Sequence, residues 1–374
     1  MKFLHVSDLH LGKRLYETSL IEDQRYVLNE IVRIVDQEKP NAILIAGDVY
    51  DKSTPSAEAV ALFDYFICEL AKRRLQTFII SGNHDSAERI AFGGKIMGSA
   101  GIRLSPVYNG EIKPITLEDE HGEVDVYMLP FVKPAHVRRF FDSEIINTYT
   151  DAVRVAINKM DVDVGKRNVL VAHQFVTGAT RSESEETVGG IDNVDSSVFE
   201  KFDYVALGHL HKPQFCDGKK IRYSGTPLKY SFSEVSDVKS VTCVTMGEKG
   251  GQLQFKTIEL KPMRDMKKVR GEFDALMSTA DRTDDYVQIT LTDENDVPNA
   301  MSRLQTIFTN ALELRYDNTR TRANGEISGA EAVERKTSLE LFSEFFGERN
   351  NSKMSDEQKE FMKNLIDKIE GESL

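Results

Sequence analysis

Short apolar segments that predict buried strands recur through the first 250 residues of this 374-residue chain. A segment of four or five apolar residues without polar alternation predicts a strand that is covered on both faces. Helical patterns separate these segments, and strands interleaved with helices predict a layered α/β architecture. The expected strands are Phe3–Val6, Ala42–Ala46, Thr77–Ile80, Val126–Leu129, Val169–Ala172 and Tyr204–Leu207.

Two helices are predicted between the first three strands. The first has apolar residues at helical spacing along one face. The second covers Ser56–Arg74 and follows Thr54 and Pro55, a pair typical of an N-cap and the first helical position. Leu62 and Phe66 lie beside the apolar stripe of the second helix, which can serve the core and consists of Val60, Phe63, Ile67 and Leu70. We therefore expect either a homodimer contact through these two side chains or a helix that is buried on two sides.

The periodicity and composition divide the chain into four predicted parts. These are a large α/β domain over residues 1–261, a small α+β domain over 262–316, a polar linker over 317–336 and a helical segment over 337–374. In the small domain we expect strands at Tyr286–Leu291 and Ala311–Tyr316 and a helix at Pro298–Phe308. Two short helices in the last part begin with capping-box patterns, at Thr337–Glu340 and Ser355–Gln358.

Charge and composition limit the partners and the compartment. A formal net charge of −12 argues against a chain that grips DNA alone, although bound cations or a partner subunit would supply positive charge. No apolar segment approaches the ~20 residues that span a bilayer. The N-terminus reaches Asp8 too early for a signal peptide, and the three cysteines lack ligand-like spacing. We expect a cytoplasmic protein without membrane attachment.

Five short polar motifs carry the chemistry, and all but one directly follow an expected strand. They are Asp8-Leu9-His10, Gly47-Asp48-Val49-Tyr50-Asp51, Gly82-Asn83-His84-Asp85, Ala172-His173-Gln174 and Gly208-His209-Leu210-His211. Open α/β sheets bind ligands in the loops at the ends of their strands. A single Asp-x-His or His-x-His is a weak signal, since either is common on protein surfaces. All five motifs together indicate one shared site.

The residue types in these motifs suit a pair of metal ions. Imidazole nitrogens combined with carboxylate oxygens favour first-row metals such as Mn²⁺ or Fe over sites made of oxygen alone. Two ions about 3.5–4 Å apart can bridge a hydroxide and clamp a phosphate. Asp48 suits the bridging position, and the glycines before Asp48, Asn83 and His209 allow sharp turns. His5 lies within the first strand, so we expect a hydrogen-bonded core histidine there.

The five motifs resemble the calcineurin-like metallophosphoesterase superfamily over about residues 1–245. The resemblance implies a layered β-sandwich flanked by helices, with the small domain as a cap. It also implies two sets of metal ligands, the first being Asp8, His10, Asp48 and His211 and the second Asp48, Asn83, His173 and His209. In this pattern His84 binds no metal and assists the leaving oxygen, and the carboxylate of Asp51 orients His84.

Within the superfamily the chain looks like the SbcD nuclease subunits of bacterial DNA repair. Three stretches carry this resemblance: Ser7–Gly12, Pro55–Ala59 and Arg222–Glu234. Protein phosphatases have Asp-Arg-Gly where this chain has Asp51-Lys52-Ser53. The resemblance implies a Mn²⁺-dependent nuclease with double-strand 3′→5′ exonuclease and single-strand or hairpin endonuclease activity. It also implies a homodimer that works with an SbcC-like coiled-coil ATPase in DNA repair, recombination and replication.

Two other functions stay open at the level of sequence. One is a stand-alone phosphodiesterase for small substrates, against which the extra domain and terminal helices argue. The other is a structural adaptor with a vestigial site, against which the complete ligand set argues. Scattered basic residues are either DNA contacts or ordinary solvated charge, and the candidates are Lys52, Arg181, Lys212 and Lys229. Similarly, Tyr223–Glu234 could serve only to pack a turn against the core.

Overall fold

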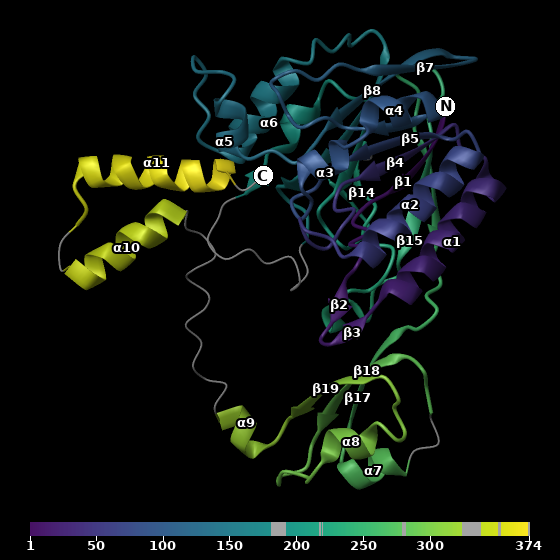
Figure 1. Cartoon of the computed structure of the whole chain (residues 1–374), viewed down its shortest axis with the longest axis vertical. Coiled ribbons are helices and arrows are strands. Elements are labelled where there is room, and N and C mark those ends of the chain that lie inside the picture. The colour runs from purple at the N-terminus through teal and green to yellow at the C-terminus, as the bar shows by residue number, and fades with distance from the viewer. Residues whose placement is uncertain are drawn as a thin grey trace.

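The computed structural model describes residues 1–180, 192–216, 218, 220–278, 282–323, 338–350 and 353–372. Residues 1–260 contain two six-stranded sheets that face each other, with helices outside them (Figure 1). In spatial order, the first sheet is β16 (Gln254–Glu259), β15 (Ser240–Thr245), β1 (Lys2–Val6), β4 (Ala42–Ala46), β5 (Gln76–Ile80) and β6 (Ile102–Leu104). The second is β13 (Gln214–Cys216), β14 (Ile221–Tyr223), β12 (Tyr204–Gly208), β9 (Arg167–His173), β8 (Gly122–Leu129) and β7 (Ile115–Asp119).

All six predicted strands are confirmed, and both of their faces are buried. In β1, Phe3 points into the core between the sheets, whereas Leu4 packs toward the outer helices. β1, β4, β5 and β6 run parallel, and so do β8, β9, β12 and β14. The carboxyl ends of these strands therefore meet at one edge of the sandwich, where ligands of α/β sheets bind.

His5 confirms the expectation of a core histidine. Its ring lies between the sheets, with Nδ1 2.8 Å from the Tyr204 hydroxyl and Nε2 3.1 Å from the carbonyl of Leu207. Burial, assisted by the nearby charge of Arg222, lowers the pKa of His5 to about 3. His5 is therefore neutral and belongs to the core, not to the metal chemistry.

Helices cover the outer faces of both sheets. α1 (Ile21–Glu38) and α2 (Ala57–Lys72) pack on the first sheet, whereas α5 (Pro134–Arg138) and α6 (Tyr149–Asn158) pack on the second (Figure 1). The N-cap of α2 is Ser56, whose side chain accepts the N–H of Ala59, so the expected Thr54 cap is wrong by two residues.

The predicted dimer face on α2 is wrong, and the alternative of a helix buried on two sides is confirmed. Leu62 and Phe66 are both 0% exposed inside the protomer core. They are covered because α1 packs against α2 beside its apolar stripe. Val60, expected in the core, is instead 45% exposed.

The small unit after residue 262 is a three-stranded parallel sheet with two helices. Its elements are β17 (Met266–Gly271), α7 (Phe273–Met277), β18 (Tyr286–Leu291), α8 (Ala300–Leu304) and β19 (Ala311–Tyr316). The predicted strands β18 and β19 are confirmed, and the predicted helix is shorter than expected. β17 and α7 were not predicted, because β17 is largely basic and exposed, as is common for edge strands.

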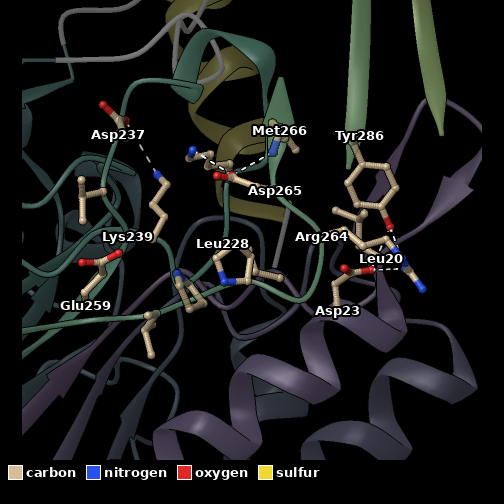
Figure 2. Close-up of a pocket in the computed structure, with 15 residues that line it drawn as sticks. Leu20, Asp23, Leu228, Asp237, Lys239, Glu259, Arg264, Asp265, Met266 and Tyr286 are labelled. Carbon is tan, nitrogen blue, oxygen red and sulfur yellow. Dashed lines mark hydrogen bonds and ion pairs between the residues drawn. The ribbon is translucent and has the colours of Figure 1, made fainter. Parts of the chain in front are cut away.

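Polar contacts join the small unit to the sandwich. Asp23 of α1 is 1% exposed and accepts hydrogen bonds from Arg264 at 2.8 Å and from the Tyr286 hydroxyl at 2.8 Å. Lys229 forms an ion pair with Asp265 at 2.8 Å. Figure 2 shows the cavity between the two units, with Asp23, Arg264, Asp265 and Tyr286 in its wall. Lys229 also lines this cavity.

The C-terminal region forms α9 (Thr319–Ala323), α10 (Ser338–Asn350) and α11 (Asp356–Glu372). The capping box at α11 is confirmed, because the Ser355 N–H donates to Gln358 Oε1 at 2.9 Å and the Gln358 N–H donates to Ser355 Oγ at 3.2 Å. Thr337, expected to cap α10, and most of the predicted linker lie outside the described residues. α10 packs on α11, and α11 also contacts α5 (Figure 1).

Shorter elements complete the description. They are β2 (Arg14–Leu15), β3 (Thr18–Ser19), α3 (Ala87–Ala91), α4 (Gly94–Met97), η1 (Gly98–Ala100), β10 (Phe175–Val176), β11 (Asn193–Val194), η3 (Ser196–Phe199) and η4 (Phe232–Glu234). Among the described residues, no helix has the length and apolar character needed to span a bilayer.

Candidate metal centre

The side chains of the five motifs meet at the carboxyl edge of the sandwich. Each lies at the end of a parallel strand or in the loop that follows it, in either sheet. They are Asp8 and His10 after β1, Asp48 and Asp51 after β4, Asn83 and His84 after β5, His173 at the end of β9, and His209 and His211 after β12. The strands of both sheets thus deliver their polar ends to one site, as the sequence predicted.

Backbone hydrogen bonds fix these loops relative to one another. The N–H of Asp8 donates to the carbonyl of Gly47 at 3.1 Å, and the N–H of His10 donates to the carbonyl of Asp48 at 2.9 Å. The carboxylates join in as acceptors: Asp8 Oδ1 accepts the N–H of His209 and Asp48 Oδ1 accepts the N–H of His84, both at 2.9 Å. One oxygen of each aspartate is therefore engaged in holding a neighbouring loop.

Close approach, more than backbone freedom, explains the glycines of the motifs. Gly47 has a φ of +85°, as expected for a sharp turn. A Cβ on Gly82 would instead lie 2.1 Å from Asp48 Oδ1, and a Cβ on Gly208 would lie 1.9 Å from the carbonyl oxygen of Ala46. These two glycines are needed because the loops they belong to touch the neighbouring strand ends.

One group of acceptor atoms converges around Asn83. Its Oδ1 lies 3.0 Å from Nε2 of His173 and 2.9 Å from Nδ1 of His209. The same Nε2 of His173 lies 3.3 Å from Oδ2 of Asp48. On the other side of the ring, Nδ1 of His173 lies 2.8 Å from the carbonyl of Ala46, to which it must donate a proton. The Nε2 lone pair of a neutral His173 would then face only oxygen acceptors.

This arrangement requires a positive charge between His173 and its neighbours. Burial disfavours the charged imidazole, yet the carboxylate of Asp48 outweighs it and raises the pKa of His173 to about 9. A proton on Nε2 would satisfy the geometry, and so would a metal ion bound to the same atoms. Asp48, Asn83, His173 and His209 are the predicted ligands of the second metal, here called the second ligand group, and their donor types suit a divalent cation.

The predicted ligands of the first metal, here called the first ligand group, are Asp8, His10, Asp48 and His211. Donor atoms of Asp8, His10 and Asp48 all lie within 4.8 Å of one another. Oδ2 of Asp8 and both ring nitrogens of His10 are buried without a hydrogen-bond partner. Such orphaned atoms are rare in native proteins, and an unplaced ion is one of their accepted explanations. The ring of His211 lies 5.2 Å from that of His10.

The pKa shifts in the first ligand group also favour the binding of a cation. Burial lowers the pKa of His10 well below its usual value, so this imidazole is neutral and can donate a lone pair. Burial raises the pKa of Asp8 to about 6. For Asp48, burial alone would raise the pKa, but the positive charge of His173 holds it well below the ordinary value. A bound cation would keep both carboxylates ionised.

His84 and Asp51 meet in a way that the sequence did not predict. Nδ1 of His84 lies 3.1 Å from the main-chain carbonyl of Asp51, not from its carboxylate. That carboxylate pairs with Lys13 at 2.8 Å and lies 3.9 Å from Nδ1 of His10. The expectation that the Asp51 carboxylate orients His84 is therefore wrong for this structure, because the carbonyl of the same residue takes that position.

Two carboxylates beside the site had no role assigned from sequence. Asp85 accepts the backbone N–H groups of Val49 at 3.0 Å, Tyr50 at 2.8 Å and Gly82 at 2.9 Å, so it ties two motif loops together. The sequence feature that could have revealed this role is the position of Asp85 directly after His84 in the third motif. Glu234 lies 3.1 Å from Nδ1 of His211, although 22 residues separate them in the chain. Only the tertiary fold reveals that second contact.

The basic residues considered as DNA contacts have different surroundings. Lys52 and Lys212 are exposed beside the centre. Lys229 is instead occupied, because its ammonium group donates to the carbonyl of Val235 at 2.8 Å and pairs with Asp265. Arg181 lies outside the described residues.

Comparisons with known proteins agree with the site. The profile of the family described as "Calcineurin-like phosphoesterase" matches residues 1–213, and that of the "Type 5 capsule protein repressor C-terminal domain" matches residues 262–350. The chain is 35% identical over 322 residues to the SbcD component of the nuclease SbcCD from Staphylococcus saprophyticus, and the match covers 84% of each protein.

Solved structures give weaker likenesses. A protein of Thermus thermophilus has a TM-score of 0.41 and 11% identity, covering 68% of this chain and 98% of its own. A dimetal phosphatase from Danio rerio has a TM-score of 0.41 and 11% identity, covering 70% of this chain and 96% of its own.

The family profile covers more than half of the chain, and the matched range contains the cluster of buried donor atoms from Asp8, His10 and Asp48. The identity to the Staphylococcus protein extends well beyond the part that the profile covers. The chain therefore belongs to the calcineurin-like phosphoesterases, a family of phosphoester hydrolases that use divalent metals, and within it to the SbcD-type nuclease subunits.

Proposed function

We propose that this protein is a Mn²⁺-dependent DNA nuclease that hydrolyses phosphodiester bonds with two metal ions. The observation that carries the proposal is the convergence of carboxylate, amide and imidazole atoms around Asn83 and around Asp8, where Oδ2 of Asp8 and both ring nitrogens of His10 have no hydrogen-bond partner. The choice of DNA as substrate is supported by the similarity to a component of a nuclease. The proposed activities are double-strand 3′→5′ exonuclease and single-strand or hairpin endonuclease.

The two ligand groups would hold one ion each, with Asp48 shared between them. When bound, the ions would activate a water molecule and neutralise charge on the phosphate. The chain itself supplies rigid loops, whose mutual hydrogen bonds hold the donor atoms in place before any ion arrives. Nitrogen and oxygen donors in these proportions suit Mn²⁺ better than Mg²⁺.

His84 is proposed to protonate the leaving oxygen of the DNA strand. Its ring lies at the rim of the centre, 5.0 Å from the ring of His10. The contact from Nδ1 to the Asp51 carbonyl requires a proton on Nδ1, so Nε2 is the ring nitrogen left to face the substrate. His84 would therefore act on substrate without holding a metal.

The C-terminal helices are proposed to bind an SbcC-like coiled-coil ATPase. Phe345 and Phe361 are 53% and 66% exposed, and Leu365 is 37% exposed, although α10 and α11 pack on each other. Apolar side chains spaced along an amphipathic helix are typical anchors for a partner groove. A homodimer of the chain is also proposed on the basis of the family, with a face other than Leu62 and Phe66.

The test compares two variants with the unaltered chain, using Mn²⁺ with labelled hairpin DNA and with bis-p-nitrophenyl phosphate. His84→Ala should lower cleavage by about 10²–10⁴-fold while both metals stay bound, since a general acid typically contributes that much. Asp48→Ala should lose metal and activity together. Metal content is measured in the same preparations. Cleavage of the small ester but never of DNA would contradict the nuclease proposal, and His84→Ala that loses metal would make His84 a ligand.

A further inference from the structure

Glu234 is a fully buried carboxylate directly behind a residue of the first ligand group. It is 0% exposed, and its Oε1 lies 3.1 Å from Nδ1 of His211. Its Oε2 pairs with the ammonium group of Lys239 at 2.7 Å and accepts the N–H of Tyr230 at 3.3 Å. Because the ammonium group of Lys239 and the N–H of Tyr230 both donate to Oε2, Glu234 is placed as a carboxylate acceptor, with Oε1 left to face His211.

Lys239 holds the same histidine by its backbone. Its ammonium group donates to the carbonyl of His211 at 3.0 Å, and its side chain is only 4% exposed. Figure 2 shows Lys239 in the wall of the cavity between the sandwich and the small unit, with Asp237 3.8 Å from its ammonium group. Glu234 therefore contacts the ring of His211, and Lys239 contacts its main-chain carbonyl.

This contact sets the tautomer of His211. An ionised carboxylate can only accept, so the proton of a neutral His211 must lie on Nδ1. The lone pair then lies on Nε2, on the other side of the ring from Glu234. Histidine ligands of metals commonly donate their second ring N–H to a carboxylate, which fixes the ring and increases its basicity.

We propose that Glu234 and Lys239 are positioning residues that hold His211 in the tautomer and orientation of a metal ligand. The inference rests on the proposed two-metal function and assigns a role to the Arg222–Glu234 stretch, which sequence alone could not separate from simple packing. A buried ion pair is a weak source of stability compared with apolar residues of the same volume. Its contacts to both the ring and the backbone of one histidine indicate that it orients this residue.

The decisive variant is Glu234→Gln in the full-length chain. Glutamine keeps the size of the side chain but removes the charge that Lys239 and the His211 ring share. One of the two Mn²⁺ sites should weaken by about 10–100-fold, as is typical when the residue behind a metal ligand is changed. Mn²⁺ titration followed by electron paramagnetic resonance measures this directly, because the exchange-coupled signal of the pair should give way to that of a single ion. Lys239→Gln should weaken the same Mn²⁺ site. If Glu234→Gln does not fold, the Mn²⁺ affinity of Lys239→Gln tests the positioning role.

The matched control is Asp119→Asn, which breaks another buried ion pair in the same sandwich. Asp119 pairs with Arg167 and with the N-terminal amine, and its side chain is 5% exposed. Arg167 and His173 are the two ends of β9, so the control pair is about 20 Å from the centre at ~3.3 Å per residue. Asp119→Asn should lower the melting temperature and leave both Mn²⁺ affinities unchanged.

The outcomes separate this inference from the proposed function. If the unaltered chain binds no pair of Mn²⁺ ions, the two-metal proposal itself fails. If it binds two and both variants at Glu234 and Lys239 do so with unchanged affinity, the positioning role is wrong. Equal weakening in Asp119→Asn would show that general destabilisation is the cause, which also overturns the positioning role.

Discussion

Four residues of the candidate metal centre have a left-handed backbone that only glycine adopts easily. They are Asp8 at φ +53°, His10 at φ +44°, Asp48 at φ +47° and His209 at φ +100°. Each such conformation costs of the order of 1–3 kcal/mol and persists only when its surroundings impose it. Here the hydrogen bonds between loops impose it, so the donor atoms are oriented before any metal binds.

Gly82 provides a test of this preorganisation. A Cβ at this position would lie 2.1 Å from Oδ1 and 2.4 Å from the main-chain nitrogen of Asp48, so Gly82→Ala must displace the Asp48 carboxylate. We expect the variant to fold but to lose at least one Mn²⁺ ion and most of its phosphodiester cleavage, measured by metal analysis and hydrolysis of bis-p-nitrophenyl phosphate.

Gly247→Ala is the matched control, because its Cβ would meet nothing within 4 Å. This control should keep both metals and full activity. Normal metal content in Gly82→Ala would mean that the loops around Asp48 are far more adaptable than their contacts suggest.

Residues of the centre could be predicted from sequence only where they lie next to a strand end. Asp8, His10 and Asp48 follow short apolar strands directly, so local pattern and geometry agree. Glu234 has no such signal, since its contact with His211 depends on how two distant loops pack. The Asp51 carboxylate was misjudged for a related reason: the choice between a carbonyl and a carboxylate depends on side-chain geometry that no pattern encodes.

Among the elements, α2 shows how neighbouring helices limit interpretation from periodicity. The stripe of apolar residues identified its core face, but the position of α1 determines which flank is covered. The six strands of the sandwich were predicted well because they are buried on both faces and therefore apolar throughout. The basic edge strand β17 was missed because exposure removes that signal.

Phe66 and Val60 test the observed orientation of α2. Phe66 is 0% exposed, so Phe66→Ala should reduce the free energy of unfolding by about 3–5 kcal/mol through lost burial and a cavity. Val60 is 45% exposed, and Val60→Ala should change it by no more than about 0.5 kcal/mol. Urea unfolding followed by circular dichroism compares them. The reverse order would place α2 with its other face toward the core.

Asp119 of β7 pairs with Arg167 of β9 and with the N-terminal amine, and we expect the stability that these ion pairs provide to depend on pH. Its hydrogen bond from Arg167, together with the N-terminal amine, holds its pKa well below the ordinary value in the folded state. A carboxyl with a depressed folded pKa stabilises the protein above its unfolded pKa of about 4, and the stabilisation is lost as the pH falls toward the folded value.

Asp119→Asn should therefore be less stable than the unaltered chain at pH 7, and the difference should shrink as the pH is lowered below about 4. Melting temperatures measured across this pH range provide the comparison. A difference that is constant with pH would show that the charge of Asp119 does not contribute, and that the loss reflects hydrogen bonding alone.

At the scale of the whole molecule, the acidic net charge and the exposed C-terminal helices both bear on how the chain would bind DNA. The net charge of −12 leaves the chain poorly suited to bind DNA through its own surface. Two metal ions would reduce the negative charge only at the centre, and a partner subunit would supply the remaining grip. The exposed Phe345 and Phe361 on the C-terminal helices offer a place for such a partner.

Deletion of residues 337–374 tests whether these helices serve the partner or the fold of the chain. The candidate metal centre lies entirely within residues 8–211, so the truncated protein should keep the proposed Mn²⁺-dependent cleavage of bis-p-nitrophenyl phosphate. It should no longer co-purify with the SbcC-like ATPase, because the proposed apolar anchors are gone. Phe361→Ser in the full chain is the finer variant, since its side chain is 66% exposed and its loss should cost little stability. Undiminished binding of the ATPase by the truncated chain would place the partner surface elsewhere on the molecule.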